Sequence, residues 1–202
     1  MTVLRALVMG TMGLLLATAC ATAPAQPQAG VNSPGPSSTT PSPAANATSP
    51  VPAASDIPAA NLPAFQCSDQ SGSGTGSAVT PVTDVRVGAQ QGYDRFVLQF
   101  GSAIPAYTVT RQMSSTFVNT PRGDQVSLAG TQGVLVVVRP IDWTSYSGKT
   151  QLKPGFTYLK EARQVENYEG VQQWGLGIQG APCLRVFTLT SPMRLVVDVQ
   201  AS

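Results

Sequence analysis

The sequence contains no histidine, and this absence limits the chemistry that the chain can perform. Histidine is the side chain most often used as a general acid or base near neutral pH, and it is the commonest metal ligand. Ser–His–Asp triads and His-ligated zinc sites are therefore excluded. Gly148-Lys149-Thr150 has the form of the end of a phosphate-binding loop, but Trp143 stands where that motif requires glycine. The pattern therefore indicates a polar loop.

Two other arrangements of side chains have catalytic counterparts. Glu166 and Glu169 form a carboxylate pair of the kind that glycoside hydrolases use. A Ser/Lys nucleophile pair would need Lys149 or Lys153, but the S-x-x-K spacing of such pairs does not occur. We therefore predict a protein that is not an enzyme and that has no cofactor and no metal site. The carboxylate pair is the remaining catalytic alternative.

Trp143 and Tyr146 are the side chains best suited to binding a ligand. They lie in the loop after Pro140, close to Asp142 and Lys149, so aromatic rings and hydrogen-bonding groups occur together. Exposed aromatic rings in such a setting stack on sugar faces or anchor protein partners. The alternative is that both rings cap one end of the domain core.

The distribution of charge excludes one class of partner. Residues 83–202 carry eleven Lys/Arg and eight Asp/Glu, which is far from the basic surface that binding to a phosphate backbone requires. We therefore predict no nucleic acid partner. Asp94 with Arg95, and Arg194 with Asp198, place opposite charges on predicted neighbouring strands, which indicates ion pairs on the solvent face.

Residues 1–19 have the layout of a secretory signal peptide. Arg5 precedes an apolar run, Ala6–Leu16, that is too short to span a bilayer, which takes about 20 apolar residues. The next residues, Leu16-Ala17-Thr18-Ala19-Cys20, resemble the lipobox of bacterial lipoproteins, in which the cysteine is acylated and becomes the new N-terminus. Ala17-Thr18-Ala19 also fits the A-x-A cleavage rule, which would release a secreted protein.

The three cysteines, Cys20, Cys67 and Cys183, bear on this choice. An odd thiol is a reactive liability in an oxidising compartment, and acylation of Cys20 would remove it. Cys67 and Cys183 would then form a disulfide, worth about 4–5 kcal/mol in the chain-entropy model; two buried free thiols are the alternative. We therefore predict a lipid-anchored protein on the extracytoplasmic face of the membrane, in the cell envelope, with secretion as the alternative.

Residues 20–66 form a predicted disordered tether. Ten of the seventeen prolines fall between Pro24 and Pro63, a density that excludes a packed helix or sheet. The stretch also has too few apolar residues to offset the entropy of ordering it. As a flexible coil it would span about 35–40 Å. Residues 67–81, with a Gly/Ser-rich run at Ser71–Ser77, are predicted to be a flexible lead-in to the domain.

From residue 82 to residue 202, short apolar runs separated by turn residues predict a β-sandwich or barrel. The first two runs form a predicted hairpin around Gln90-Gln91-Gly92. The Val/Leu run at 133–138 predicts a strand buried on both faces, and the run at 158–165 predicts a strand, with a short helix as the alternative. Further strands are expected at 107–111, 169–178, 184–189 and 194–199. We therefore expect an all-β domain, an antiparallel β-sandwich of about eight strands.

Three stretches of this domain resemble the AMIN family: 82–87, 93–100 and 191–199. AMIN domains open on an I-x-x-[IV]-x-[IV] strand and end on a P-x-R-[LI]-V-[IV]-D strand, which Pro192–Asp198 matches. More closely, 168–177 and 185–189 resemble the AMIN-like domain of actinobacterial exported lipoproteins. The motif residues, to which a structural role is assigned, are Asp94, Arg95, Glu169, Gly170, Trp174, Arg194 and Asp198.

The resemblance implies a β-sandwich that targets its protein to the cell envelope and binds peptidoglycan, as the AMIN domains of cell-wall amidases and pilus secretins are thought to do. Here the module would be the whole protein, without a catalytic domain beside it. We therefore expect a non-catalytic lipoprotein whose partner is peptidoglycan or another wall glycan. The alternative is a protein-interaction scaffold for an envelope enzyme or a secretion complex.

Overall fold

The computed structural model describes residues 61–201, which form thirteen strands and no α-helix. Eight long strands coincide with the eight predicted from the sequence, which confirms the all-β prediction. They are β2 (Thr80–Gln90), β3 (Tyr93–Phe100), β4 (Ala106–Gln112), β7 (Gln132–Arg139), β10 (Leu159–Tyr168), β11 (Val171–Ile178), β12 (Pro182–Thr190) and β13 (Met193–Ala201). Because β10 covers the run at 158–165, the helix alternative there is wrong.

Five short strands complete the described chain: β1 (Gln70–Gly72), β5 (Thr116–Val118), β6 (Gln125–Ser127), β8 (Ile141–Asp142) and β9 (Gln151–Leu152). β1 lies within the Gly/Ser-rich lead-in, where the sequence predicts no strand because Gly and Ser have little strand propensity. It forms because β4 pairs with it, residue by residue, in antiparallel register.

The signal peptide, Cys20 and residues 20–60 of the predicted tether lie outside the described residues, so those predictions stay untested. The last residues of the predicted tether, 61–66, are described and contact the five-stranded sheet. Within residues 61–201, no helix is long and apolar enough to cross a membrane.

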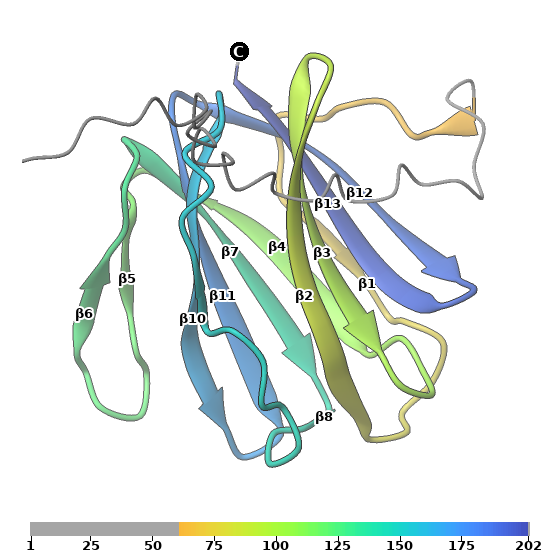
Figure 1. The fold of residues 1–202 in the computed structure, drawn as a ribbon. Coiled ribbons are helices and arrows are strands. Elements are labelled where there is room, and N and C mark those ends of the chain that lie inside the picture. Colours follow the sequence, from red (N-terminus) through yellow and green to blue (C-terminus); the bar gives the residue numbers. More distant parts are fainter. Residues whose placement is uncertain (1–60, 202) are drawn as a thin grey trace, which may run out of the picture. The chain divides into compact units, whose positions relative to one another are not determined.

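The strands form two sheets that face each other as a sandwich (Figure 1). The six-stranded sheet has the order β1-β4-β7-β11-β10-β9 and is antiparallel throughout. The five-stranded sheet has the order β12-β13-β3-β2-β8 and is antiparallel except for the β2–β8 pair. The predicted hairpin is present as β2 and β3.

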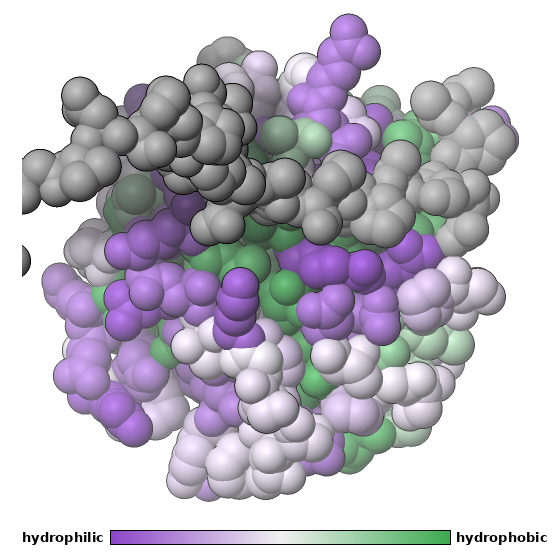
Figure 2. All heavy atoms as spheres, in the orientation of Figure 1, coloured by the Kyte–Doolittle hydropathy of each residue, from purple (hydrophilic) through white to green (hydrophobic). Residues whose placement is uncertain are grey.

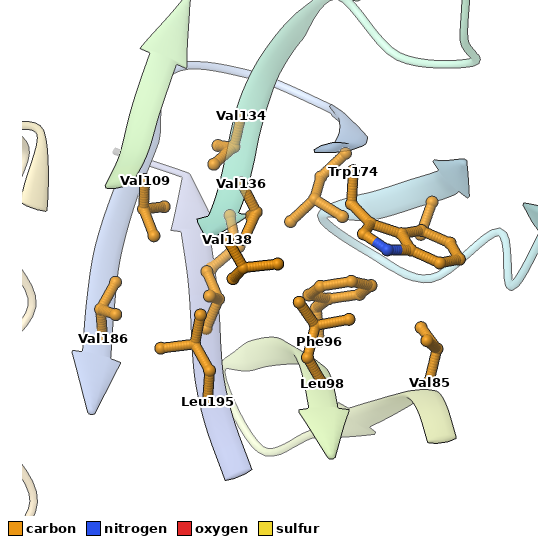
Figure 3. Packing of buried hydrophobic residues seen from close by; sticks show 14 of the residues in the cluster. Val85, Phe96, Leu98, Val109, Val134, Val136, Val138, Trp174, Val186 and Leu195 are labelled. Atoms are coloured by element: carbon orange, nitrogen blue, oxygen red, sulfur yellow. The ribbon is translucent and has the colours of Figure 1, made fainter. Parts of the chain in front are cut away.

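One apolar core fills the space between the sheets (Figure 3). Trp174 of β11 is fully buried, and its ring lies 5.7 Å from that of Phe96 of β3, measured between centroids. Its indole Nε1 donates to Gln172 Oε1 at 3.0 Å, so its one polar atom is satisfied. Alternate residues of β7 and β13 point into this core, each burial contributing about 1.5–3 kcal/mol; they are Val134, Val136, Val138, Leu195, Val197 and Val199.

Asp94, a family-motif residue, ties the two sheets together. Its Oδ2 accepts the backbone N–H groups of Tyr158 at 2.6 Å and Leu159 at 2.8 Å, at the start of β10. The carboxylate is buried, and a buried charge is tolerated only when such hydrogen bonds replace its hydration. Its role in this fold is therefore structural.

The β5–β6 hairpin packs on the outer face of the six-stranded sheet. Phe117 of β5 lies over Gly133 of β7 and Gly175 of β11. A Cβ at Gly133 would stand 2.6 Å from Phe117 Cζ, and a Cβ at Gly175 would stand 2.8 Å from Phe117 Cδ2. Leu128 and Val165 complete this second cluster of buried residues, and Leu135 packs against it. Glycine on the sheet is what allows the hairpin to approach.

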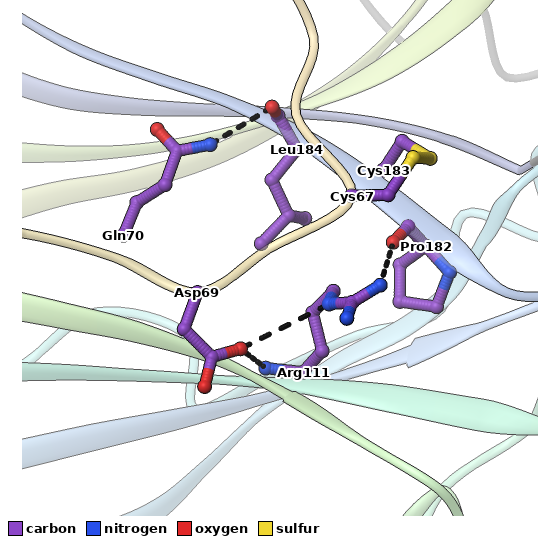
Figure 4. Close-up of a disulfide and its surroundings, with 7 residues drawn as sticks. All are labelled: Cys67, Asp69, Gln70, Arg111, Pro182, Cys183 and Leu184. Atoms are coloured by element: carbon purple, nitrogen blue, oxygen red, sulfur yellow. Dashed lines mark hydrogen bonds and ion pairs between the residues drawn. A yellow bond between two sulfur atoms is a disulfide. The ribbon is translucent and has the colours of Figure 1, made fainter.

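The N-terminal segment, residues 61–67, is held against the five-stranded sheet (Figure 4). Gln66 exchanges two backbone hydrogen bonds of 2.7 Å with Leu184 of β12. Cys67 and Cys183 form the predicted disulfide, which rules out the free-thiol alternative. Gln70 Nε2 also donates to the Leu184 carbonyl at 2.9 Å. The start of the domain is thereby joined to its penultimate strand.

Replacing both cysteines, Cys67→Ser with Cys183→Ala, should lower the free energy of unfolding by about 2–5 kcal/mol. The bond closes a loop with a sequence separation of 116 residues, so its loss enlarges the unfolded ensemble. Urea denaturation measures the difference. The parent protein in reducing agent should unfold like the variant, and equal midpoints for oxidised parent and variant would contradict the prediction.

Candidate functional site

A groove of about 330 Å³ runs beside the second half of β10. One wall is the tip of the β5–β6 hairpin, and the other is the last five residues of β10. The lining residues are Asn119, Pro121, Arg122, Gln164, Val165, Glu166, Asn167 and Tyr168. Hydrophilic side chains gather over this part of the molecule, at the left of Figure 2. Polar residues therefore dominate the groove.

The groove exists because β10 is incompletely covered at its edge. Within the described chain, β9 pairs only with Ala162 and Arg163, so no strand flanks β10 beyond them. A register irregularity between Gln164 and Glu166 marks the place where the covered part ends. Asn119 Nδ2 donates to the Val165 carbonyl at 2.7 Å and holds the hairpin tip against the strand.

The two walls carry opposite charges. Glu166 is only 8% exposed, and its Oε2 accepts a hydrogen bond of 2.8 Å from Gln173 Nε2. Arg122 sits in the hairpin turn, where its backbone N–H bonds to Asn119, and its guanidinium is held by no ion pair or hydrogen bond within residues 61–201. Gln164 Nε2 is buried without a hydrogen-bond partner in the same part of the chain.

An exposed aromatic pair adjoins one end of the groove. Trp143 and Tyr168, 39% and 45% exposed, have ring centroids 5.9 Å apart at an interplanar angle of 53°. Asn167 Nδ2 donates to the Trp143 carbonyl at 2.8 Å and ties this loop to β10. We call Trp143 and Tyr168 the aromatic ledge; since Tyr168 also lines the groove, ledge and groove are continuous.

A short side-chain turn presents Trp143. Asp142 Oδ1 accepts hydrogen bonds from Thr144 N at 3.1 Å and Thr144 Oγ1 at 2.7 Å, which reverses the chain around Trp143. These hydrogen bonds from Thr144 lower the pKa of the Asp142 carboxyl group. The carboxylate therefore stays ionised and holds the loop at neutral pH.

Tyr146, which the sequence groups with Trp143, lies elsewhere. Its ring packs against the core, edge-on to Trp174 at 6.3 Å between centroids, and its hydroxyl donates to the Lys149 carbonyl at 2.7 Å. Burial, with a smaller contribution from the charge of Asp84, raises the pKa of Tyr146 to about 12. Tyr146 thus caps the core, and the partner of Trp143 is Tyr168, which the sequence analysis treated only as part of a family motif.

Glu169 and Gly170, also motif residues, form the turn between β10 and β11. Their φ angles of 45° and 79° are both positive, as in the two-residue turns that suit the twist of a hairpin. Glu169 accepts a hydrogen bond from the Tyr168 hydroxyl and raises the pKa of that phenol. The turn therefore helps to place the aromatic ledge. Glu166, the other member of the carboxylate pair, lies in the groove.

The charged motif residues of the five-stranded sheet form a buried network, not the solvent-face ion pairs that the sequence indicates. Asp198 of β13 is fully buried and lies between Arg95 of β3 and Arg185 of β12. Arg95 donates to both carboxylate oxygens at 2.6 and 2.9 Å, and Arg185 Nε donates to Oδ2 at 2.8 Å. Arg194 instead donates to the carbonyls of Ser191 and Pro192 in its own turn.

Two arginines against one aspartate leave an excess positive charge, and aromatic rings surround it. The Arg185 guanidinium lies 4.5 Å from the ring centroid of Phe65 and 4.6 Å from that of Tyr93. Arg95 lies 5.5 Å from the ring of Phe187. Such contacts contribute about 0.5–2 kcal/mol each. Burial alone would lower the pKa of Arg95, but the hydrogen bond and charge of Asp198 raise it.

The N-terminal segment covers this network. Phe65 packs on Tyr93 and Arg185, and Leu62 packs on the apolar strip of Val97, Phe187, Leu189 and Val196. The outer face of the five-stranded sheet is therefore structural. The groove lies on the other sheet, and the aromatic ledge joins Tyr168 of that sheet to Trp143, which directly follows β8 at the edge of the five-stranded sheet. No group of three His, Cys, Asp or Glu side chains that could hold a metal ion occurs within residues 61–201.

The substitution Asp198→Asn should lower the free energy of unfolding by about 3–5 kcal/mol, because two buried guanidinium groups would lose their counter-charge. Asp84→Asn is the matched control: its side chain is 46% exposed and pairs with Arg86, so the loss should stay below about 1 kcal/mol. Thermal or urea unfolding compares the two. Equal effects would show that the buried network adds no stability.

Comparison with known proteins agrees with this architecture. The family model described as the AMIN-like domain matches residues 80–201, which is most of the described chain. No curated protein matches the sequence. AMIN-like domains are envelope-associated binding domains and are generally non-catalytic. The chain therefore belongs to the AMIN-like domain family.

Proposed function

We propose that this domain is a non-catalytic module that binds a glycan of the cell wall, with peptidoglycan as its main ligand. The observation that carries the proposal is the exposed aromatic ledge of Trp143 and Tyr168 beside a polar groove. Membership of the AMIN-like family supports binding within the envelope. The two aromatic rings and the polar groups of the groove lie side by side, and this combination supports binding of a sugar.

The ledge suits the chemistry of a sugar ring. A pyranose has an apolar face of C–H groups and a rim of hydroxyl groups, so it packs on an aromatic ring while hydrogen bonds orient it. Beside the ledge, Asn167 has an amide that already bonds the Trp143 carbonyl and Gln172, and Glu166 has a carboxylate whose Oε2 accepts from Gln173, so the remaining hydrogen-bonding capacity of both groups faces the site. These groups can bond hydroxyls without a large loss of conformational entropy, since β10 holds them.

Removing the ledge should release the protein from the wall. In sedimentation with insoluble peptidoglycan, Trp143→Ala and Tyr168→Ala should each weaken binding about 5- to 30-fold, equivalent to about 1–2 kcal/mol. Met113→Ala is the matched control, because Met113 is 89% exposed but lies at the end of β4 by a different hollow, so binding should be unchanged.

If peptidoglycan retains the two ledge variants as well as it retains the parent, the ledge does not bind the wall. If the parent itself does not sediment, while cross-linking recovers one stoichiometric envelope protein, the scaffold alternative holds instead. In that alternative, a partner protein would bind at the β10 edge, which lacks a neighbouring strand beyond Arg163 in the described chain.

We also propose that residues 1–19 are removed, that Cys20 is acylated, and that the predicted tether, up to the segment 61–66 that packs on the domain, links the domain to the outer face of the membrane. Two acyl chains give stable anchoring where one is marginal. The tether would let the domain reach the wall, since a coil of that length spans about 35–40 Å. The support is the sequence pattern of this segment together with the envelope association of the family.

Cys20→Ser separates the two modes of export. For a lipoprotein, the substitution should leave a larger, uncut precursor, because processing requires the acylated cysteine. For a secreted protein, Ala17-Thr18-Ala19 remains intact and cleavage should proceed as in the parent. Immunoblots of membrane and medium fractions measure both outcomes, and a processed variant in the medium would contradict lipid anchoring.

A further inference from the structure

We propose that the groove beside β10 holds the peptide that branches from the wall glycan, while the aromatic ledge holds the sugar. This inference rests on the proposed function and assigns separate parts of the ligand to the two parts of the site. In peptidoglycan, a short peptide is attached to alternate sugars; it carries free carboxylates and, where it is not cross-linked, a free amine. The groove has the chemistry to bind such a zwitterionic peptide.

The charges of the groove match both ends of this ligand. Arg122 on the hairpin wall has a guanidinium with no partner in the described chain, and a guanidinium binds a carboxylate through paired N–H groups. Glu166 on the opposite wall presents a carboxylate to an ammonium group. Tyr168 at one end is the only aromatic ring among the lining residues. Sugar stacking is thus confined to the ledge.

The edge of β10 offers hydrogen bonds of the kind that peptide groups make. Beyond Arg163 no strand flanks β10 within residues 61–201. The Gln164 N–H still donates to the Thr150 carbonyl at 2.8 Å, so the edge without a neighbouring strand or loop partner in the described chain is Glu166–Tyr168. Asn119 Nδ2 already donates to the Val165 carbonyl at 2.7 Å, which shows that an amide N–H fits against this edge. An extended peptide binds a sheet edge through the same main-chain groups.

The side-chain amide of Gln164 gives a second reason to place a peptide in the groove. Its Nε2 is buried and has no hydrogen-bond partner within the described residues, and an unsatisfied buried donor costs about 1–3 kcal/mol. Gln164 lines the groove, so a peptide carbonyl bound there is a candidate acceptor for this amide.

The ledge and the groove are continuous, just as the sugar and its peptide are covalently joined in the ligand. Tyr168 belongs both to the ledge and to the groove lining, so a sugar stacked on the ledge has its substituents at the mouth of the groove. The volume of about 330 Å³ is at the lower end of the range for ligand pockets, about 300–1,000 Å³, and suits a short peptide.

The test compares two soluble wall fragments of equal glycan length, one with its peptides and one stripped of them by an amidase. Calorimetric titration of the full chain, purified in detergent, should show at least tenfold tighter binding of the peptide-bearing fragment. Arg122→Gln should reduce this advantage about 3- to 10-fold and leave binding of the stripped glycan unchanged. Arg163→Gln, an exposed arginine on β10 outside the groove lining, is the matched control and should change neither.

The outcomes separate this inference from the function on which it rests. Equal affinity for the two fragments, with Trp143→Ala weakening both, would overturn the peptide assignment and leave wall-glycan binding intact. No binding of either fragment would overturn both. An advantage that Arg122→Gln and Arg163→Gln reduce equally would show general attraction to charge and would also overturn the assignment. Because Arg122 is exposed in a turn, its substitution should leave the circular dichroism spectrum unchanged.

Discussion

The candidate site depends on the close approach of the β5–β6 hairpin to the six-stranded sheet. Phe117 can lie against the sheet because β7 and β11 have glycine at positions 133 and 175, where any side chain would collide with its ring. Protein interiors are packed too densely to absorb such a collision without moving an element. If the hairpin moved outward, Asn119 would lose the Val165 carbonyl and the groove would lose one wall. Two residues without side chains thus maintain a site to which they contribute no functional group.

The two outer faces of the sandwich have different roles. On the five-stranded sheet, the N-terminal segment, the disulfide and the Arg95–Asp198–Arg185 network form one covered assembly. Here the buried charges are balanced within the assembly, since Asp198 accepts hydrogen bonds from both arginines and aromatic rings lie against the guanidinium groups. On the six-stranded sheet, the hairpin covers only part of the surface and leaves the β10 edge open. A chain attached through residues 61–67 therefore presents its groove on the opposite side of the sandwich.

The charged residues of the family motif have different structural roles, although they look alike in the sequence. Asp94 and Arg95 are neighbours in sequence, but alternation along a strand sends Asp94 into the space between the sheets and Arg95 to the outer face. Glu169 and Gly170 have a backbone role, since both adopt positive φ. None of these four residues lines the groove, so their role is to hold the scaffold; among the groove residues, Tyr168 alone belongs to a stretch that carries the family resemblance.

The sequence by itself determined the all-β class, because the alternation of apolar residues depends on local order. It also predicted the eight long strands and the Cys67–Cys183 pair, but a helix at 158–165 and two free thiols stayed open until the structure excluded them. The sequence also singled out Trp143, since an aromatic residue among polar neighbours in a loop is visible without coordinates. Only the tertiary structure decided that Tyr146 caps the core, that Tyr168 is the partner of Trp143, and that Asp198 is buried between two arginines. These outcomes depend on which strands become neighbours and which segment covers a face, and contacts between residues far apart in the chain leave no periodic signal in it.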